Sequence, residues 1–224
     1  MLNPFIRVTA FIAILCALIA LPAQAQDDLL SIIYDVSQNA SALVTLETFD
    51  AVDAWENYSN PMGVELGVEN GMYRAYTMNS GYVWGLNQES HTDVILEVEA
   101  TPLTIHLGNG FGIMCRASTN GDGYYFMING NGEFSISKGE GDYVLPLVDW
   151  QPSDAIRRDI DLNHIRAICI GDTLAMMVND QLVAEVTDTT YTDGFAGLSV
   201  AAAENSDVDV AFDNLAIYVP ATQD

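Results

Sequence analysis

Glu97 and Glu99 are the closest approach in this sequence to a catalytic pair of carboxylates. A strand through Glu97-Val98-Glu99 would place both acids on one face, and retaining glycosidases use two carboxylates about 5 Å apart. A solvated strand face explains the same spacing. The sequence has no intervening aspartate, no third acid, no nucleophile elbow, no phosphate loop and no histidine-rich metal box. It therefore predicts no catalytic residue, and we expect no hydrolysis of β-glucans.

Trp84, Arg116 and Tyr125 are better suited to binding a sugar than to breaking one. Aromatic rings offer flat stacking surfaces, and a guanidinium offers hydrogen-bond donors beside them. Tyr82 and Trp84 are two positions apart, so they share one face of a strand. If Cys115 points into a core, Arg116 points to the opposite face. The competing interpretation is that each aromatic ring is part of the core.

Cys115 and Cys169 are the two cysteines that remain if the N-terminal segment is removed. An even pair in an exported protein favours a disulfide bond between them. The closed loop would contain about 55 residues, which is worth about 4 kcal/mol in the chain-entropy model. Two buried free thiols are the alternative.

The N-terminal residues are typical of a cleavable signal peptide. Arg7 precedes an apolar run over 8–21, and Ala23-Gln24-Ala25 supplies the small residues of a cleavage site. The run is shorter than the roughly 20 residues of a membrane-spanning helix, although an uncleaved anchor is the alternative. We therefore expect residues 1–25 to be removed and the mature chain to be periplasmic or secreted, without membrane insertion.

The chain is strongly acidic, with a formal net charge of −24 at pH 7. Such a surface repels phosphate backbones and anionic lipid headgroups, so nucleic acid is excluded as a partner. Neutral glycans and cations are compatible with it. Acidity that only keeps an exported protein soluble is the simpler explanation.

Short apolar or alternating runs separated by Gly, Asn and Asp begin at Thr45 and continue to Val219. This pattern is typical of an all-β sandwich or barrel, because no run shows a sustained helical period. We divide the chain into a signal peptide (1–25), a leader (26–44), one β-domain (45–219) and a tail (220–224). The segments 93–100, 113–117, 124–128, 133–138, 164–170, 173–178, 181–186 and 208–219 are the expected strands.

Several motifs resemble the concanavalin A-like lectin/glucanase superfamily. They include Thr48-Phe49-Asp50, Gly71-Met72-Tyr73, Met114-Cys115-Arg116-Ala117 and Phe212-Asp213-Asn214-Leu215. Within the superfamily the chain is most similar to bacterial domains described as family 16 glycoside hydrolase-like or 3-keto-disaccharide hydrolase domains. The resemblance implies a jelly-roll β-sandwich of two antiparallel sheets. It carries no activity with it, because a shared fold does not transfer a function.

A structural calcium ion is the one cofactor that the sequence suggests. The apolar pattern of 208–219 slips by one residue at Asp213-Asn214, which indicates a β-bulge. The first and last strands of jelly rolls commonly lie side by side, which would bring Glu47 and Asp50 towards Asp213. Carboxylate oxygens suit Ca²⁺, so Asp50 and Asp213 are the predicted ligands. Polar groups that only satisfy the backbone of the bulge are the alternative.

These observations lead to one preferred function and two alternatives. The preferred function is an exported module that binds a neutral glycan or glycoconjugate through Trp84, Arg116 and Tyr125. The alternatives are a glycoside hydrolase-like enzyme and an extracellular structural or adhesive domain. Stacking on an aromatic ring requires fewer groups than hydrolysis, which favours binding.

Overall fold

The computed structural model describes residues 42–51, 55–78 and 81–220. These residues contain fifteen strands and no helix, and hence no helix that could cross a membrane. Leu43–Val219 form one compact unit. The predicted signal peptide, nearly all of the predicted leader and residues 221–224 lie outside the described residues. The first strand begins at Ala42, inside the segment that the sequence assigned to the leader.

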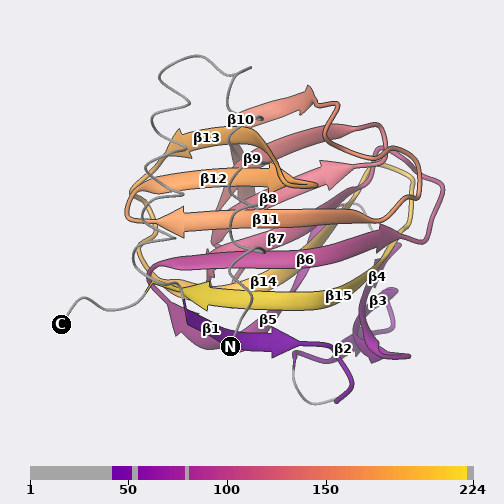
Figure 1. Cartoon of the computed structure of the whole chain (residues 1–224). Coiled ribbons are helices and arrows are strands. Elements are labelled where there is room, and N and C mark those ends of the chain that lie inside the picture. Colours follow the sequence, from indigo (N-terminus) through magenta and orange to yellow (C-terminus); the bar gives the residue numbers. More distant parts are fainter. Residues whose placement is uncertain (1–41, 52–54, 79–80, 221–224) are drawn as a thin grey trace, which may run out of the picture. The chain divides into compact units, whose positions relative to one another are not determined.

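The strands form two antiparallel sheets (Figure 1), so the predicted jelly-roll sandwich is confirmed. The nine-stranded sheet has the order β13-β12-β11-β6-β15-β4-β3-β2, with β1 paired to β15. Its strands are β1 (Ala42–Glu47), β2 (Tyr58–Asn60), β3 (Val64–Glu69), β4 (Met72–Thr77), β6 (Val94–Pro102), β11 (Asn163–Ile170), β12 (Thr173–Val178), β13 (Gln181–Thr187) and β15 (Val208–Val219).

The six-stranded sheet has the order β10-β9-β8-β7-β14-β5. Its strands are β5 (Gly81–His91), β7 (Gly110–Ala117), β8 (Gly123–Asn129), β9 (Glu133–Glu140), β10 (Tyr143–Pro152) and β14 (Gly194–Ala202). Hairpin turns join β7 to β8 and β8 to β9, as the Asn-Gly-rich segments predict. The two outer strands of this sheet are therefore β10 and β5.

The predicted bulge in the last strand is present. The pairing of β15 with β6 shifts between Asp213 and Ala216, and Asn214 has a φ of 52°. A left-handed residue inside a strand reverses the alternation locally, which is why Phe212 and Leu215 both reach the core. The slip in the apolar period is thus a structural feature of the strand.

The main core lies between the sheets and includes three aromatic rings that pack against one another. Phe49, Trp55 and Tyr73 pack with centroid separations of 5.7–6.0 Å. The Tyr73 hydroxyl donates to the carbonyl of Glu56 at 2.9 Å. It also crosses to the opposite sheet, where a Cβ on Gly85 would stand 1.8 Å from it. Only glycine fits there, so β4 and β5 are held together by one buried tyrosine.

Cys115 of β7 and Cys169 of β11 form a disulfide, as predicted. Both side chains are fully buried. Because β7 belongs to the six-stranded sheet and β11 to the nine-stranded sheet, the bond joins the two layers through the core.

Candidate functional site

The outer face of the six-stranded sheet carries a second apolar cluster, separate from the main core. The face opposite the core is commonly solvated in a two-layer sandwich, yet Met114 and Met127 are fully buried on it. We call this group the outer cluster. Its buried members are Leu86, Met114, Ala117, Tyr125 and Met127, and Tyr82, Trp84, Phe195 and Ala201 pack against them.

A glycine on β14 leaves room for large side chains from neighbouring strands to meet above it. Gly197 lies on β14, and a Cβ there would stand 2.8 Å from the side chain of Leu86. The rings of Tyr82 on β5 and Tyr125 on β8 meet edge to face at 5.2 Å, although β14 and β7 lie between their strands. The aromatic side chains therefore converge over the centre of the sheet.

Trp84 projects from β5 onto the turn that joins β7 to β8. A Cβ on Gly121 would stand 2.6 Å from Cη2 of the indole, so that glycine, at a φ of 91°, lets the turn close over the ring. Trp84 remains half-buried. It is thus held by its neighbours while part of its surface reaches solvent, which suits a stacking platform.

Tyr125 lies in the same cluster but is almost inaccessible, with 1% of its surface exposed. Its hydroxyl donates to the carbonyl of Gly121 at 2.7 Å. Burial, with smaller contributions from Tyr82 and Asp122, raises the pKa of this phenol. The structure therefore places Tyr125 beside Trp84, as predicted, but as a neutral support beneath the exposed rings.

Trp150 is a member of this face that sequence reasoning missed. It projects from the outer strand β10 and is 41% exposed. A Cβ on Gly110 of β7 would stand 3.3 Å from both its Cη2 and the Cε of Met127. The indole therefore lies across β9 and β8. Pairing of β10 with β9 is irregular between Val148 and Gln151, so strict alternation along the strand could not have placed Trp150.

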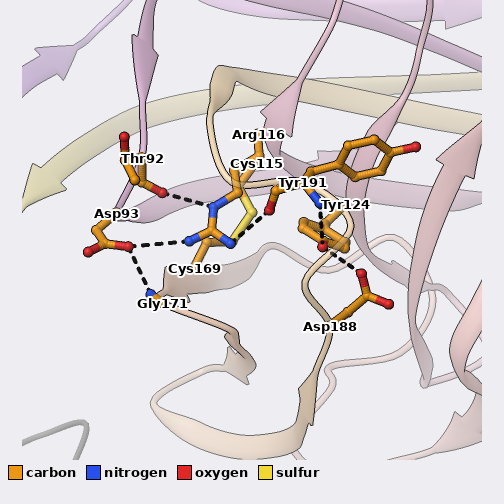
Figure 2. Close-up of a disulfide and its surroundings, with 9 residues drawn as sticks. All are labelled: Thr92, Asp93, Cys115, Arg116, Tyr124, Cys169, Gly171, Asp188 and Tyr191. Atoms are coloured by element: carbon orange, nitrogen blue, oxygen red, sulfur yellow. Dashed lines mark hydrogen bonds and ion pairs between the residues drawn. A yellow bond between two sulfur atoms is a disulfide. The ribbon is translucent and has the colours of Figure 1, made fainter.

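Arg116 has a different role from the predicted one (Figure 2). Its side chain is 1% exposed. Nε donates to the carbonyl of Thr92 at 2.8 Å, Nη1 to that of Tyr191 at 3.1 Å, and Nη2 to the carboxylate of Asp93 at 3.3 Å. The guanidinium therefore connects three segments inside the fold and offers no donor fork to a ligand.

The reason for this difference is the backbone at the end of β7. Arg116 has a φ of 50°, and the pairing of β7 with β14 shifts between Gly197 and Phe195. Such a bulge turns the side chain away from the face that alternation assigns to it. Ala117 occupies the outer face instead.

The segment after β13, which contains Tyr191, is also held in place by side chains close to Arg116. The Tyr124 hydroxyl donates to Asp188 at 2.7 Å and accepts from the amide of Tyr191 at 3.0 Å (Figure 2). Lys138 adds an ion pair to Asp188 at 3.3 Å. Burial raises the pKa of Asp188, but hydrogen bonds from Thr190, Tyr124 and Lys138 outweigh it and lower that pKa to about 2. Asp188 is thus a charged structural anchor.

Glu97 and Glu99 share a face, as predicted, but it is the outer face of the nine-stranded sheet. Their neighbours Leu96 and Val98 are in the main core. Glu97 pairs with Arg166 at 2.6 Å, and Glu99 accepts from Asn214 at 2.9 Å. Burial raises the pKa of Glu97, but His164 and Arg166 outweigh it and lower that pKa. Both acids lie on the opposite side of the sandwich from the outer cluster.

Asp50 and Asp213 each bond to a near neighbour in the chain. The hydroxyl of Thr48 donates to Asp50 at 2.8 Å, and the amide of Asn214 donates to Asp213 at 2.7 Å. Strand β1 does pair with β15. Within residues 42–51, 55–78 and 81–220, no three His, Cys, Asp or Glu side chains gather as metal ligands. The calcium ion stays a prediction.

Thermal unfolding decides whether calcium binds at Asp50 and Asp213. If it does, millimolar calcium should raise the Tm relative to excess chelator, because a ligand of the native state stabilises that state by mass action. The gain should disappear in Asp213→Asn. An unchanged Tm would remove the site.

Comparisons with known proteins agree with this architecture. A model of the 3-keto-alpha-glucoside-1,2-lyase-like domain matches residues 46–218. No curated protein sequence matches the chain.

Three solved structures illustrate the likeness in fold. Carbohydrate-binding module CBM66 from Bacillus subtilis is 18% identical, with a TM-score of 0.57 over 75% of this chain and 97% of that one. A protein of unknown function with a galectin-like fold, also from Bacillus subtilis, is 11% identical, with a TM-score of 0.59 over 79% and 96%. A β-1,3-1,4-glucanase (lichenase) from a mouse hindgut metagenome is 14% identical, with a TM-score of 0.55 over 79% and 98%. At these identities the likeness shows the fold alone, and that fold is the two-sheet sandwich expected from the motifs.

Proposed function

The chain belongs to the 3-keto-alpha-glucoside-1,2-lyase-like domain family, and we propose that it is a carbohydrate-binding module. It is exported and recognises a neutral glycan or glycoconjugate through the outer face of the six-stranded sheet. The observation that carries this proposal is the outer cluster, in which aromatic rings are supported from below and remain partly exposed.

The composition of the outer cluster favours a neutral ligand. All nine of its side chains are apolar or aromatic, so it offers stacking and apolar contact without a fixed charge. The acidic surface of the whole chain would repel an anionic polysaccharide. The structural neighbour CBM66 is itself a carbohydrate-binding module, which is consistent with a sugar ligand but does not identify it.

Binding is preferred over hydrolysis because of where the acids lie. Hydrolysis with retention requires two carboxylates on the sugar's face of the protein. Glu97 and Glu99 are on the other sheet, engaged by Arg166 and Asn214. An enzyme would have to use different residues, and a purely structural domain would leave the exposed rings without a role.

Substitution of Trp84 tests the proposal. On a panel of neutral oligosaccharides, Trp84→Ala should weaken binding of any ligand by roughly two- to twelvefold, because loss of a stacking ring removes about 0.5–1.5 kcal/mol. Its circular dichroism spectrum should stay that of a β-sandwich. Isothermal titration calorimetry measures the affinity.

Tyr58→Ala is the matched control for this experiment. Tyr58 is 46% exposed and lies on β2 of the other sheet, so its loss should leave the affinity unchanged. Equal weakening by both substitutions, or an affinity that is unchanged without Trp84, would contradict a site on the outer face.

A further inference from the structure

Ser135 has a buried hydroxyl without a hydrogen-bond partner on the same outer face. Its neighbours on β9, Phe134 and Ile136, both point into the main core, so Ser135 points to the opposite side of the sheet. The residue is 1% exposed, and no group in the described part of the chain bonds to its Oγ. Buried hydroxyls are nearly always paired, so this exception requires an explanation.

Ser135 lies in a cross-strand row that runs from β7 to the stretch of β10 that contains Trp150. It pairs with Met127 of β8, and Met127 pairs with Gly112 of β7. On the other neighbouring strand, β10, Gln151 pairs with Phe134 and Val148 pairs with Ile136. The irregular part of β10 that contains Trp150 therefore stands directly across from Ser135.

The side chains that border this row, those of Trp150 and Met127, can rotate. Trp150 is 41% exposed, and its indole and the end of the Met127 side chain both border the space above Gly110. Within the described residues, the side chains of Trp150 and Met127 make no hydrogen bond or ion pair. A rotation of Trp150 about its side-chain torsions would expose the row without moving a strand, and it would leave the indole beside the opened space.

We propose that Ser135 is a specificity-determining residue that hydrogen-bonds a hydroxyl of a neutral sugar ring packed against Trp150. The inference rests on the proposed function and extends it to a second contact, remote from Trp84. A serine hydroxyl both donates and accepts, which matches the hydroxyl groups of a sugar. Glu133, two residues away on the same strand, would disfavour an anionic sugar.

The Ser135→Ala variant tests the inference through two independent measurements. Removal of an unpaired buried hydroxyl should raise the Tm of the free protein by about 2–4 °C. The same change should weaken the binding of a neutral oligosaccharide, identified from the panel above, about fivefold. A residue that matters only to the fold would not give this combination of greater stability and weaker binding.

Ser199→Ala is the control from the same face. Ser199 is fully buried on β14, and its hydroxyl donates to the carbonyl of Val83 at 3.0 Å. Its replacement should lower the Tm and leave the affinity within about twofold, because a satisfied hydroxyl stabilises the folded chain.

The outcomes separate this inference from the proposed function. A lower Tm for Ser135→Ala would show that the hydroxyl is satisfied in the folded protein and would overturn the inference. Unchanged affinity in Ser135→Ala, with binding weakened in Trp84→Ala, would overturn the inference and leave the proposed function standing. No binding of any panel member would overturn the proposed function itself.

Discussion

Replacement of Cys115 and Cys169 by alanine together should lower the free energy of unfolding by about 4 kcal/mol. The disulfide closes a loop with a sequence separation of 54 residues, and the chain-entropy model assigns about that much to a loop of this size. It also joins strands from the two different sheets. Urea denaturation of the oxidised wild-type protein and of the double variant measures the difference.

Reduction of the wild-type protein provides the control for this prediction. The reduced protein should be less stable than the oxidised protein because it lacks the cross-link. It should be somewhat more stable than the double variant, which also lacks two buried sulfur atoms. Mass spectrometry of the non-reduced, alkylated protein should detect no free thiol at either position. Two alkylated cysteines in the native protein, or equal stability of the double variant and the oxidised protein, would contradict the bond.

Arg116→Ala should be the most damaging single substitution of a charged residue, at about 3 kcal/mol. The side chain is buried, and its loss would leave the carbonyls of Thr92 and Tyr191 without their donors. Asp93 would lose its partner guanidinium and keep its bond from the amide of Gly171 at 2.8 Å (Figure 2). Chemical denaturation again supplies the measurement.

Arg166→Ala is the matched control for Arg116. Arg166 also forms an ion pair, with Glu97, but its side chain is 30% exposed. A partly exposed pair of this kind contributes about 1 kcal/mol, so the two arginine variants should differ clearly. Similar losses for both would mean that Arg116 is not the internal connection that its geometry indicates. Because Arg116 follows Cys115 directly, its effect should not be additive with loss of the disulfide.

The architecture could be predicted from the sequence because its signals are local. Alternation in 93–100 and Asn-Gly turns between 113 and 138 describe strands that pair with their neighbours in the chain. The phase slip at Asp213-Asn214 appears as a bulge for the same reason. Pairing of the cysteines followed from their number and the expected export, and needed no geometry.

The functional face was predicted only in part because bulges break the alternation on which the prediction depends. Trp84 and Tyr125 share a face, as expected, since both lie in regular stretches. Arg116 follows the bulge of β7 and turns inward. Trp150 lies in an irregular stretch of β10, and its contact with Gly110 crosses intervening strands. Such contacts depend on tertiary structure and leave no periodic signal in the sequence.

The exposure of each residue was also beyond sequence reasoning. Tyr125 and Ser135 lie on the same face of the sheet as Trp84, yet both are almost fully buried while Trp84 is not. Their burial results from side chains that converge from distant strands, as the contact between Tyr82 and Tyr125 shows. The exposed ring that can stack on a ligand, Trp84, and the buried ring beside it, Tyr125, can therefore be distinguished only in the folded protein.

The three tryptophans of the chain allow the central claim, that a neutral glycan binds the outer face of the six-stranded sheet, to be tested in one measurement. Trp84 and Trp150 lie on that face, whereas Trp55 is 4% exposed and packs between the sheets against Phe49 and Tyr73. The three indole N–H signals can be followed by NMR during titration with a glycan from the panel, after assignment with single Trp→Phe variants. The account predicts saturable shifts of the Trp84 and Trp150 signals and a constant Trp55 signal. Saturable binding that leaves both the Trp84 and the Trp150 signals unmoved would contradict it.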